Sequence, residues 1–220
     1  MCFYGAVGDY MQRVIKRFFD IVFSLCCSVF AIPIMAIAIV FIYVNSPKGS
    51  PFFKQMRVGY KGKPFVVYKL RTMTNEVDEK GNLLSDELRL KRWGRVIRKL
   101  SIDELPQIWN ILAGQMSWIG PRPLLANEMC VMTTEEQRIR QSVLPGITGW
   151  EAVHEGESTT RTEMAQYDIY YVKNWSLWLD VKIFFMTVMI LFAAKRAEDE
   201  YRAPKVKDEE VKNEEVYTEK

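Results

Sequence analysis

Two adjacent acidic residues, Asp103 and Glu104, have the types and the position that phosphoryl chemistry needs. They follow Ser101 and precede Pro106 and an apolar run at helical spacing over residues 108–112, a pattern that predicts the start of a helix. The start of a helix stabilises anions, so Asp103 would stay ionised and a phosphate would be drawn to the neighbouring amides. Asp103 could then attack phosphorus and form an acyl phosphate, while Glu104 gave oxygen ligands to a Mg²⁺ ion shared with a diphosphate.

The same residues also admit a purely structural interpretation. Ser101 and Glu104 fit the S-x-x-E capping box, and Asp103 could itself be the cap with Pro106 in the first turn. On local sequence alone this use is the commoner one, because acidic residues are frequent in first turns. In the functional interpretation, the side chains of adjacent helical residues point about 100° apart. One carboxylate could therefore be the nucleophile and the other the metal ligand.

Basic residues supply two further candidates. Arg122 stands between Pro121 and Pro123, which stiffen the loop. A guanidinium held in this way suits bidentate phosphate binding, although an ordinary proline-rich turn with an exposed arginine is the alternative. Six more bases fall within eleven residues of a predicted helix: Arg89, Lys91, Arg92, Arg95, Arg98 and Lys99. This helix suits lipid headgroups or a diphosphate better than nucleic acid.

Composition excludes several classes of protein. With 49% apolar and 26% charged residues, the 220-residue chain is neither disordered, collagen-like nor a disulfide scaffold. A single histidine, His154, excludes a two-histidine metal site, and the four cysteines lack the spacing of a zinc or redox motif, so we expect reduced thiols. Phosphate-loop, dinucleotide-binding and Asp-x-Asp motifs are absent. Residues 1–196 hold 25 bases against 18 acids, a net charge of +7 that suits anionic partners.

An uncharged apolar run over residues 21–44 predicts a membrane element. It is longer than the centre of a signal peptide, so we expect no cleavage. Pro33 lies near its middle and predicts a kink. Basic residues flank both ends, at positions 13–17 and 48–63. Because cytoplasmic flanks retain positive charge, this favours a helix that breaks at Pro33 and returns to the same face over a kinked spanning helix.

The remaining elements are predicted from shorter patterns. Residues 52–58 and 65–70 read as two strands joined by a turn containing glycine and proline. The apolar stretch 183–194 is too short to span a bilayer, and nearby tryptophans and bases suit a helix in the headgroup region, with a buried core helix as the alternative. The charged segment 197–220 is expected to be disordered or a solvated helix.

Five blocks in this order resemble the bacterial sugar transferases, the monotopic polyprenyl-phosphate phosphoglycosyl transferases that initiate glycoconjugate and exopolysaccharide assembly. The blocks are KRFFDI at 16–21, YKLRTM at 68–73, DELPQ at 103–107, GPRP at 120–123 and PGITGW at 145–150. Together they cover about residues 13–190 and are far more specific than any one of them. The resemblance favours the catalytic interpretation of Asp103 over the capping one.

The resemblance implies an α+β fold that is mainly α. A re-entrant helix over residues 13–45, broken at Pro33, would precede a catalytic domain over 46–196 with a small β-hairpin and interfacial amphipathic helices, and then the tail 197–220. The enzyme would lie in the bacterial inner membrane with its catalytic face in the cytoplasm. A homodimer is compatible with this, and nucleic acid is not expected as a partner.

The implied reaction takes place in two steps. Asp103 would attack the β-phosphate of a UDP-sugar and release UMP, and the phosphosugar would then pass to polyprenyl (undecaprenyl) phosphate. Glu104 would hold Mg²⁺. Lys69 and Arg122 would line the phosphate site, with three further residues near it: Arg71, Arg161 and Asp168.

Two positions depart from what the family often carries. Ile32 stands before Pro33 where serine is frequent, and His154 stands where asparagine is frequent. Ile32 cannot satisfy a carbonyl freed by the proline, although Ser28 lies one turn earlier and could. His154 is expected to be a loop residue or a sugar contact, and residues 155–158 could read the sugar.

Two other functions remain as alternatives. A membrane-anchored scaffold of a polysaccharide assembly system would use the basic surface without turnover. A glycosyltransferase that moves the sugar alone would release UDP, and the missing Asp-x-Asp pair disfavours it.

Overall fold

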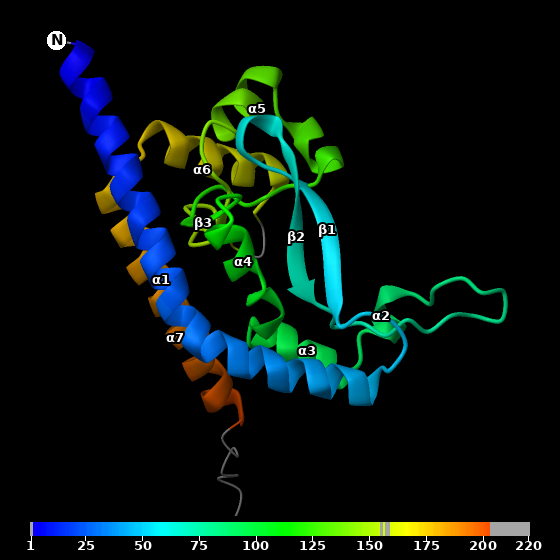
Figure 1. Ribbon diagram of the computed structural model, residues 1–220. Coiled ribbons are helices and arrows are strands. Elements are labelled where there is room, and N and C mark those ends of the chain that lie inside the picture. Colours follow the sequence, from blue (N-terminus) through cyan, green and yellow to red (C-terminus); the bar gives the residue numbers. More distant parts are fainter. Residues whose placement is uncertain (1, 155, 157–158, 203–220) are drawn as a thin grey trace, which may run out of the picture.

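A computed structural model describes residues 2–154, 156 and 159–202, with side chains described for 10–154, 156 and 159–193. Its largest element is helix α1 (Cys2–Asn45), which contains Pro33. Figure 1 shows α1 changing direction partway along its length, as expected for a proline that removes a backbone donor. The Ser28 hydroxyl donates to the Ser24 carbonyl, not to one that Pro33 frees. The positions 155, 157 and 158 of the expected sugar-reading loop, and 203–220 of the tail, lie outside the described residues.

A β-hairpin follows α1. Strands β1 (Phe52–Val58) and β2 (Pro64–Leu70) pair antiparallel in the register Phe52 with Leu70 and Val58 with Pro64, which confirms the two predicted strands. The 3-10 turn Tyr60–Gly62 joins them, with Lys61 and Gly62 at positive φ.

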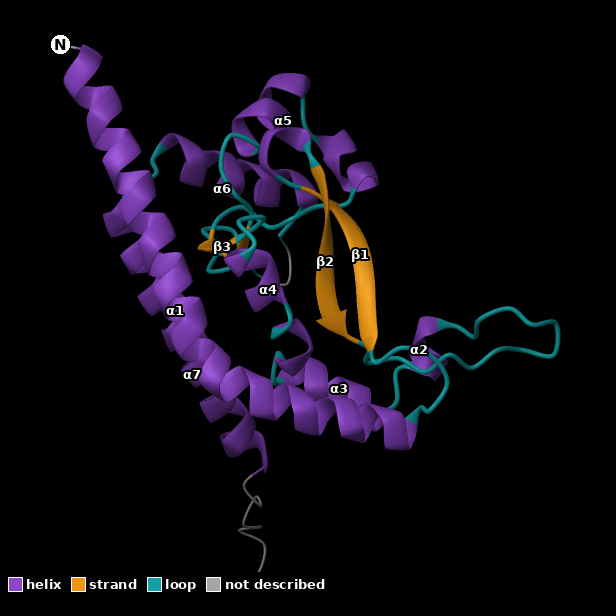
Figure 2. Cartoon of the chain, in the orientation of Figure 1, coloured by secondary structure: helices purple, strands orange, loops and turns teal. Residues whose placement is uncertain are grey.

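Further helices, most of them short, and one parallel strand pair follow in the described part of the chain (Figure 2). In chain order they are α2 (Asp86–Arg89), α3 (Arg92–Lys99), α4 (Gln107–Leu112), β3 (Ser117–Ile119), α5 (Thr134–Arg140), β4 (Gly146–Thr148), α6 (Arg161–Lys173) and α7 (Leu177–Arg202). The pairing of β3 with β4 was not predicted. It brings Gly146 so close to the backbone of Gly120 that a side chain at position 146 would collide with it. The architecture is mainly helical with little sheet, as the sequence predicts.

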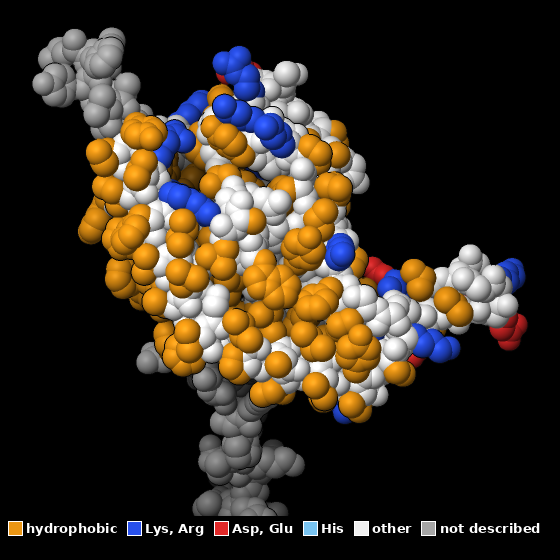
Figure 3. Space-filling view, viewed as in Figure 1, with side chains coloured by type: hydrophobic (Ala, Val, Ile, Leu, Met, Phe, Trp, Pro, Cys, Tyr) orange, Lys and Arg blue, Asp and Glu red, His pale blue; other side chains and the backbone are white. Residues whose placement is uncertain are grey.

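Helix α1 is both an apolar surface and part of the core. Ala31 and Met35 pack on Ile108 of α4, and Ala38 and Ile42 lie in a cluster with the β2 residue Leu70. The opposite face leaves many large apolar side chains exposed, and Figure 3 shows them gathered over α1. Among the described residues, the stretch Tyr10–Asn45 is the one helix whose length and composition would allow it to cross a membrane.

Helix α7 combines the two interpretations offered for residues 183–194. Ile183 is fully buried against Ile119 and Tyr171. Along the same helix, large apolar side chains are exposed: Trp178, Phe185, Met189, Leu191 and Phe192. One face of α7 therefore belongs to the core, while the rest presents apolar surface.

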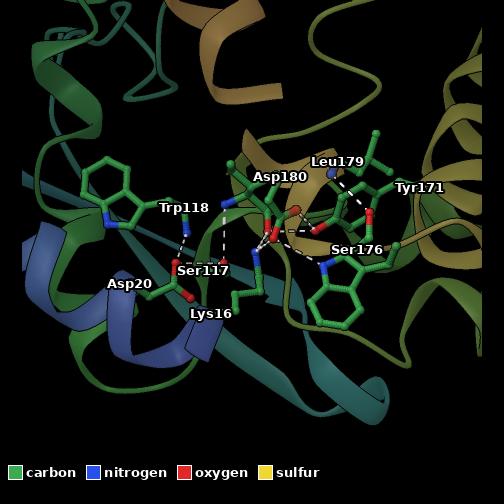
Figure 4. A network of polar contacts seen from close by, with 10 residues as sticks. Lys16, Asp20, Ser117, Trp118, Tyr171, Ser176, Leu179 and Asp180 are labelled. Carbon is green, nitrogen blue, oxygen red and sulfur yellow. Dashed lines mark hydrogen bonds and ion pairs between the residues drawn. The ribbon is translucent and has the colours of Figure 1, made fainter. Parts of the chain in front are cut away.

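A polar network fixes α1 to α7 and to β3 (Figure 4). The ammonium of Lys16 lies 2.6 Å from the Asp180 carboxylate and donates to the Ile119 carbonyl at 2.9 Å. Asp180 also accepts from the Tyr171 hydroxyl at 2.7 Å and from the Trp175 indole at 3.2 Å. The groups are largely buried, so the network joins segments far apart in sequence through strong, desolvated contacts.

One turn further along α1, Asp20 holds the start of β3. Its carboxylate accepts from the Ser117 hydroxyl at 3.0 Å and from the Trp118 amide at 3.2 Å (Figure 4). Arg17 donates to the Leu112 carbonyl at the end of α4. The sequence presented Lys16 and Arg17 as charges that flank the membrane element, but both bind other parts of the protein. Their positions alone therefore do not show which side of a membrane the start of α1 faces.

Candidate functional site

Asp103 lies in a cleft of about 440 Å³ between the end of the hairpin and α3. The charged residues of its wall come from β2 and the segment after it, from α2 and α3, and from the turn before α4. They are Lys69, Arg71, Arg89, Arg98, Asp103 and Glu104. Four bases around two carboxylates make this cleft suitable for a phosphorylated ligand.

The local backbone at Asp103 differs from the predicted helix start. Ser101 adopts the left-handed conformation with φ of 52° and makes no side-chain cap bond. A short 3-10 turn, Ile102–Glu104, follows, and α4 begins only at Gln107. The capping box is therefore wrong, because the Ser101 side chain caps no amide and a 3-10 turn, not an α-helix, follows it.

Burial controls the charge of Asp103. Its side chain is 8% exposed, and desolvation raises the pKa of the carboxyl above its ordinary value, with the neighbouring Glu104 raising it further. Lys69 and Arg98 oppose this rise through their positive charge. Nearby bases and the backbone amide of Asp103 in the 3-10 turn thus favour the anion, and burial opposes it.

Glu104 forms an ion pair with Lys69, whose ammonium lies 2.5 Å from its carboxylate oxygen. Lys69 is placed by β2, and β2 is held to α4 by the buried Asn110. The Asn110 amide donates to the Val66 carbonyl at 2.6 Å and its oxygen accepts from the Tyr68 amide at 3.3 Å. Sequence reasoning missed Asn110; its signal is a polar residue among the apolar positions of a short helix.

The predicted basic helix contributes Arg98 to the same cleft. Gly94 of α3 packs so tightly on the Thr72 carbonyl that a side chain there would collide with it. This close approach lets the Arg98 guanidinium donate to the Thr72 hydroxyl at 2.8 Å. Arg71 also lines the cleft, but its guanidinium donates to the Ser46 and Lys48 carbonyls and so fastens the turn after α1.

The other predicted residues line a second hollow. Arg122, Arg161 and Asp168 surround a space of about 210 Å³ together with Glu128 and Glu151. The structure thus divides the candidate residues into two groups instead of one.

Arg57 lies between the two hollows. Its guanidinium donates to Gln55 of the first wall at 2.7 Å and to Glu128 of the second at 3.2 Å. Burial lowers its pKa, and the charges that act on it come from both groups: Glu128 and Glu104 oppose the fall and Arg122 adds to it. Arg57 therefore links the walls of the two hollows.

Comparison with known proteins decides the family. The model of the bacterial sugar transferase family matches residues 11–194, which is most of the chain. This chain belongs to the bacterial sugar transferase family.

Three relatives illustrate the breadth of the family. The chain is 49% identical over 178 residues, 80% of its length and 86% of the other protein, to the uncharacterized sugar transferase EpsL of Bacillus subtilis (strain 168). It is 38% identical over 196 residues to a UDP-glucose:undecaprenyl-phosphate glucose-1-phosphate transferase of Klebsiella pneumoniae, covering 85% of the chain and 42% of that protein. It is 40% identical over 185 residues to a UDP-N-acetylgalactosamine-undecaprenyl-phosphate N-acetylgalactosaminephosphotransferase of Aeromonas hydrophila, covering 79% and 43%. The chain thus spans less than half the length of the last two relatives.

In this sugar transferase, Asp168 is a buried member of an ion pair. Arg140 of α5 donates to one Asp168 oxygen at 2.7 Å and also to the carbonyl of Arg122. Burial raises the pKa of Asp168, and Arg140 opposes the rise. The backbone amide of Arg122 also lowers the pKa of Asp168. Asp168 therefore fixes the Arg122 loop through Arg140, a partner that the sequence did not indicate.

His154 of the sugar transferase is placed by an aromatic cluster. Its ring lies 4.0 Å from the ring of Trp150 and its Nδ1 atom is 2.8 Å from the Trp150 carbonyl. The ring of Tyr167, from α6, lies 5.5 Å from the His154 ring. His154 is thus a packed, half-buried residue in the turn after β4.

Proposed function

We propose that this sugar transferase moves a sugar-1-phosphate from a UDP-sugar to undecaprenyl phosphate, releasing UMP and forming undecaprenyl-diphospho-sugar. Relatives at 38% and 40% identity bear names that state this reaction for two different sugars. The observation that carries the proposal is the buried Asp103, which faces a cleft with Lys69 and Arg98 in its wall. The reaction would be the first membrane step of glycoconjugate or exopolysaccharide synthesis.

The proposed chemistry uses the Asp103 carboxylate twice. In the first step a carboxylate oxygen attacks the β-phosphorus of the UDP-sugar, and the bond from that phosphorus to the bridging oxygen breaks, so UMP leaves with the electron pair. In the second step a phosphate oxygen of undecaprenyl phosphate attacks the phosphorus of the aspartyl phosphosugar and restores the carboxylate. Lys69 and Arg98 orient the phosphate groups and offset their charge.

Mg²⁺ fits this cleft as an ion held jointly by protein and substrate. Among the described residues no group of three or more metal-ligating side chains forms a ready cage. Mg²⁺ commonly takes one or two carboxylates and completes its shell with phosphate oxygens and water, and Glu104 would be its ligand here. When bound, Mg²⁺ would neutralise part of the diphosphate charge. Lys69, which pairs with Glu104, would then be free to contact phosphate.

We further propose that α1 enters the bacterial inner membrane and returns, so that the catalytic face lies in the cytoplasm. The exposed apolar side chains of α1, its proline and the membrane-bound acceptor support this arrangement. Single cysteines on the two sides of Pro33, in a protein without native cysteines, should react with an impermeant reagent only from the cytoplasmic side. Labelling of residues 10–12 from the periplasm would show a spanning helix instead.

Nucleotide release tests the reaction directly. Purified full-length protein, Mg²⁺ and undecaprenyl phosphate are incubated with a panel of UDP-sugars, and UMP is resolved from UDP. UMP from at least one donor is expected, and that donor identifies the sugar. UDP would show transfer of the sugar alone, and a wild-type protein inactive on every donor would favour a scaffold role.

Glu104→Gln should change both rate and pH dependence. The acid limb of kcat/KM follows protonation of Asp103, whose raised pKa makes activity fall at a higher pH than for an ordinary aspartate. Removing the Glu104 charge removes one cause of that rise, so the acid limb should move to lower pH. We also expect kcat to fall about 10²-fold and its Mg²⁺ dependence to weaken.

A pH–rate series at several Mg²⁺ concentrations measures both effects. Glu135→Gln, which disrupts an exposed pair with Arg138 on α5, serves as the control and should leave both profiles unchanged. An acid limb that stays in place in Glu104→Gln would show that this limb does not report Asp103.

A further inference from the structure

Three guanidinium groups from separate elements lie in or beside the second hollow: Arg122 and Arg161 line it, and Arg57 donates to Glu128 in its wall. Arg57 comes from β1, Arg122 from the loop after β3, and Arg161 is the first residue of α6. Like charges repel, and the effect is visible at Arg57, whose pKa is lowered by burial and further by Arg122. Some acidic group must hold these side chains together in the free protein.

Glu128 is placed to do so. One carboxylate oxygen accepts from the Arg161 guanidinium at 3.3 Å, and the other accepts from Arg57 at 3.2 Å and from the Leu125 amide at 2.8 Å. Burial would raise the pKa of Glu128, but the amide and the two guanidinium groups bring it below its ordinary value. Glu128 is therefore ionised at neutral pH and bridges residues more than 100 positions apart.

Comparison with Glu136 separates this role from simple capping. Each glutamate stands three positions after the residue that starts a short helical turn. Each carboxylate accepts a hydrogen bond from the backbone amide of that first residue, Leu125 for Glu128 and Thr133 for Glu136. At Glu136 the carboxylate oxygen that accepts the amide also accepts the Thr133 hydroxyl. Leu125 has no hydroxyl to offer Glu128, whose oxygens accept from the two arginines instead.

We infer that Glu128 is a positioning residue that holds Arg57 and Arg161 as a preformed receptor for a phosphate group of the nucleotide donor. This inference rests on the proposed function, because it takes the anion to be that donor. The pairing with Glu128 restricts Arg161 more than Arg57, because the Arg161 side chain is 65% exposed and would sample many rotamers without a partner.

The direction in which Glu128→Gln changes anion affinity tests the inference, because a charge effect and a positioning effect act in opposite directions. If Glu128 acted only through its charge, removing it would leave the hollow more positive and anions would bind more tightly. If Glu128 positions the arginines, their release should weaken binding, because ordering each one again opposes association. We expect KM for the UDP-sugar and Kd for UMP to rise about 3- to 10-fold, with kcat within about twofold of wild type.

The experiment compares four full-length proteins in detergent: wild type, Glu128→Gln, Arg161→Gln and the double variant. Titration calorimetry gives Kd for UMP and for inorganic diphosphate, and UMP release gives kcat and KM. If the two substitutions acted independently, the rise in Kd of the double variant would be the product of the two single rises. We expect a smaller rise, because Glu128 acts partly through Arg161. Glu136→Gln is the matched control and should alter thermal stability without changing Kd.

Each outcome bears on one of the two claims. Unchanged or tighter binding by Glu128→Gln overturns the positioning role, and so does strict additivity with Arg161→Gln, while the proposed function stands if the wild type still releases UMP. A wild type that releases no UMP overturns the function alone. The diphosphate titration then still tests the receptor, since it needs no turnover.

Discussion

Asp103→Asn should abolish phosphosugar transfer while leaving the fold intact. An amide cannot attack phosphorus or leave from it, and loss of the nucleophile in comparable covalent mechanisms lowers kcat by about 10⁴-fold or more. Burial raises the pKa of Asp103, which means that the ionised form is held at a cost to the fold. A neutral asparagine removes that cost, so Tm should be unchanged or higher.

Two measurements check this result. Steady-state UMP release gives the loss of kcat, and mass spectrometry of protein quenched after mixing with donor should show an added phosphosugar on wild type and none on Asp103→Asn. Asp78→Asn, at an exposed loop residue that lines neither hollow, is the control and should keep wild-type turnover. Wild-type turnover in Asp103→Asn would exclude this residue as the nucleophile.

Lys16→Met should strongly destabilise the protein. The substitution leaves the Asp180 carboxylate buried beside Tyr171 without its cation, and breaking a buried ion pair from one side costs about 3–5 kcal/mol. It also removes the shorter of two hydrogen bonds to the Ile119 carbonyl, at the end of β3 before the loop that carries Arg122. Thermal unfolding in detergent, followed by tryptophan fluorescence, measures the loss.

A surface ion pair provides the comparison. Lys91→Met breaks the contact between Lys91 and Glu76, both of which are well exposed, and such pairs contribute about 0–1 kcal/mol. The double substitution Lys16→Met with Asp180→Leu should be less destabilising than Lys16→Met alone, because no unpaired charge remains. Equal Tm values for Lys16→Met and Lys91→Met would refute the structural importance of the buried pair.

Local patterns predicted the elements whose causes are local. The hairpin follows from two short segments on either side of a turn that contains glycine and proline, and its strands were located to within one residue. Helix α4 follows from apolar spacing over 108–112, and Gly114, two residues after its end, has the positive φ typical of a residue that ends a helix. The left-handed Ser101 could not be predicted in this way, because its neighbours fit an ordinary cap equally well.

Contacts between residues far apart in the chain could not be predicted from a single sequence. Lys16 and Asp180 stand 164 positions apart, and the parallel pairing of β3 with β4 depends on the same assembly. Each residue alone reads as a surface charge or as a short apolar stretch. Nothing in the spacing says which acid meets which base.

The candidate site was predicted in its members but not in its layout. Resemblance to the family placed Lys69 and Arg122 at one phosphate site, whereas the structure puts them in two hollows with Arg57 between them. Arg57 lies in a strand outside every motif, and its importance comes only from the neighbours that folding gives it.

The dual character of α1 has a consequence for handling the enzyme. An apolar N-terminal helix is often deleted to obtain a water-soluble catalytic fragment. Here such a deletion would remove Met35 and Ile42 from two clusters of the core. It would also leave the Asp180 carboxylate without the ammonium of Lys16 and the Ser117 hydroxyl without the Asp20 carboxylate to which it donates. The fragment would expose new apolar surface and aggregate. Solubility must therefore be sought in the amphiphile that surrounds the whole chain, whether detergent, nanodisc or lipid particle.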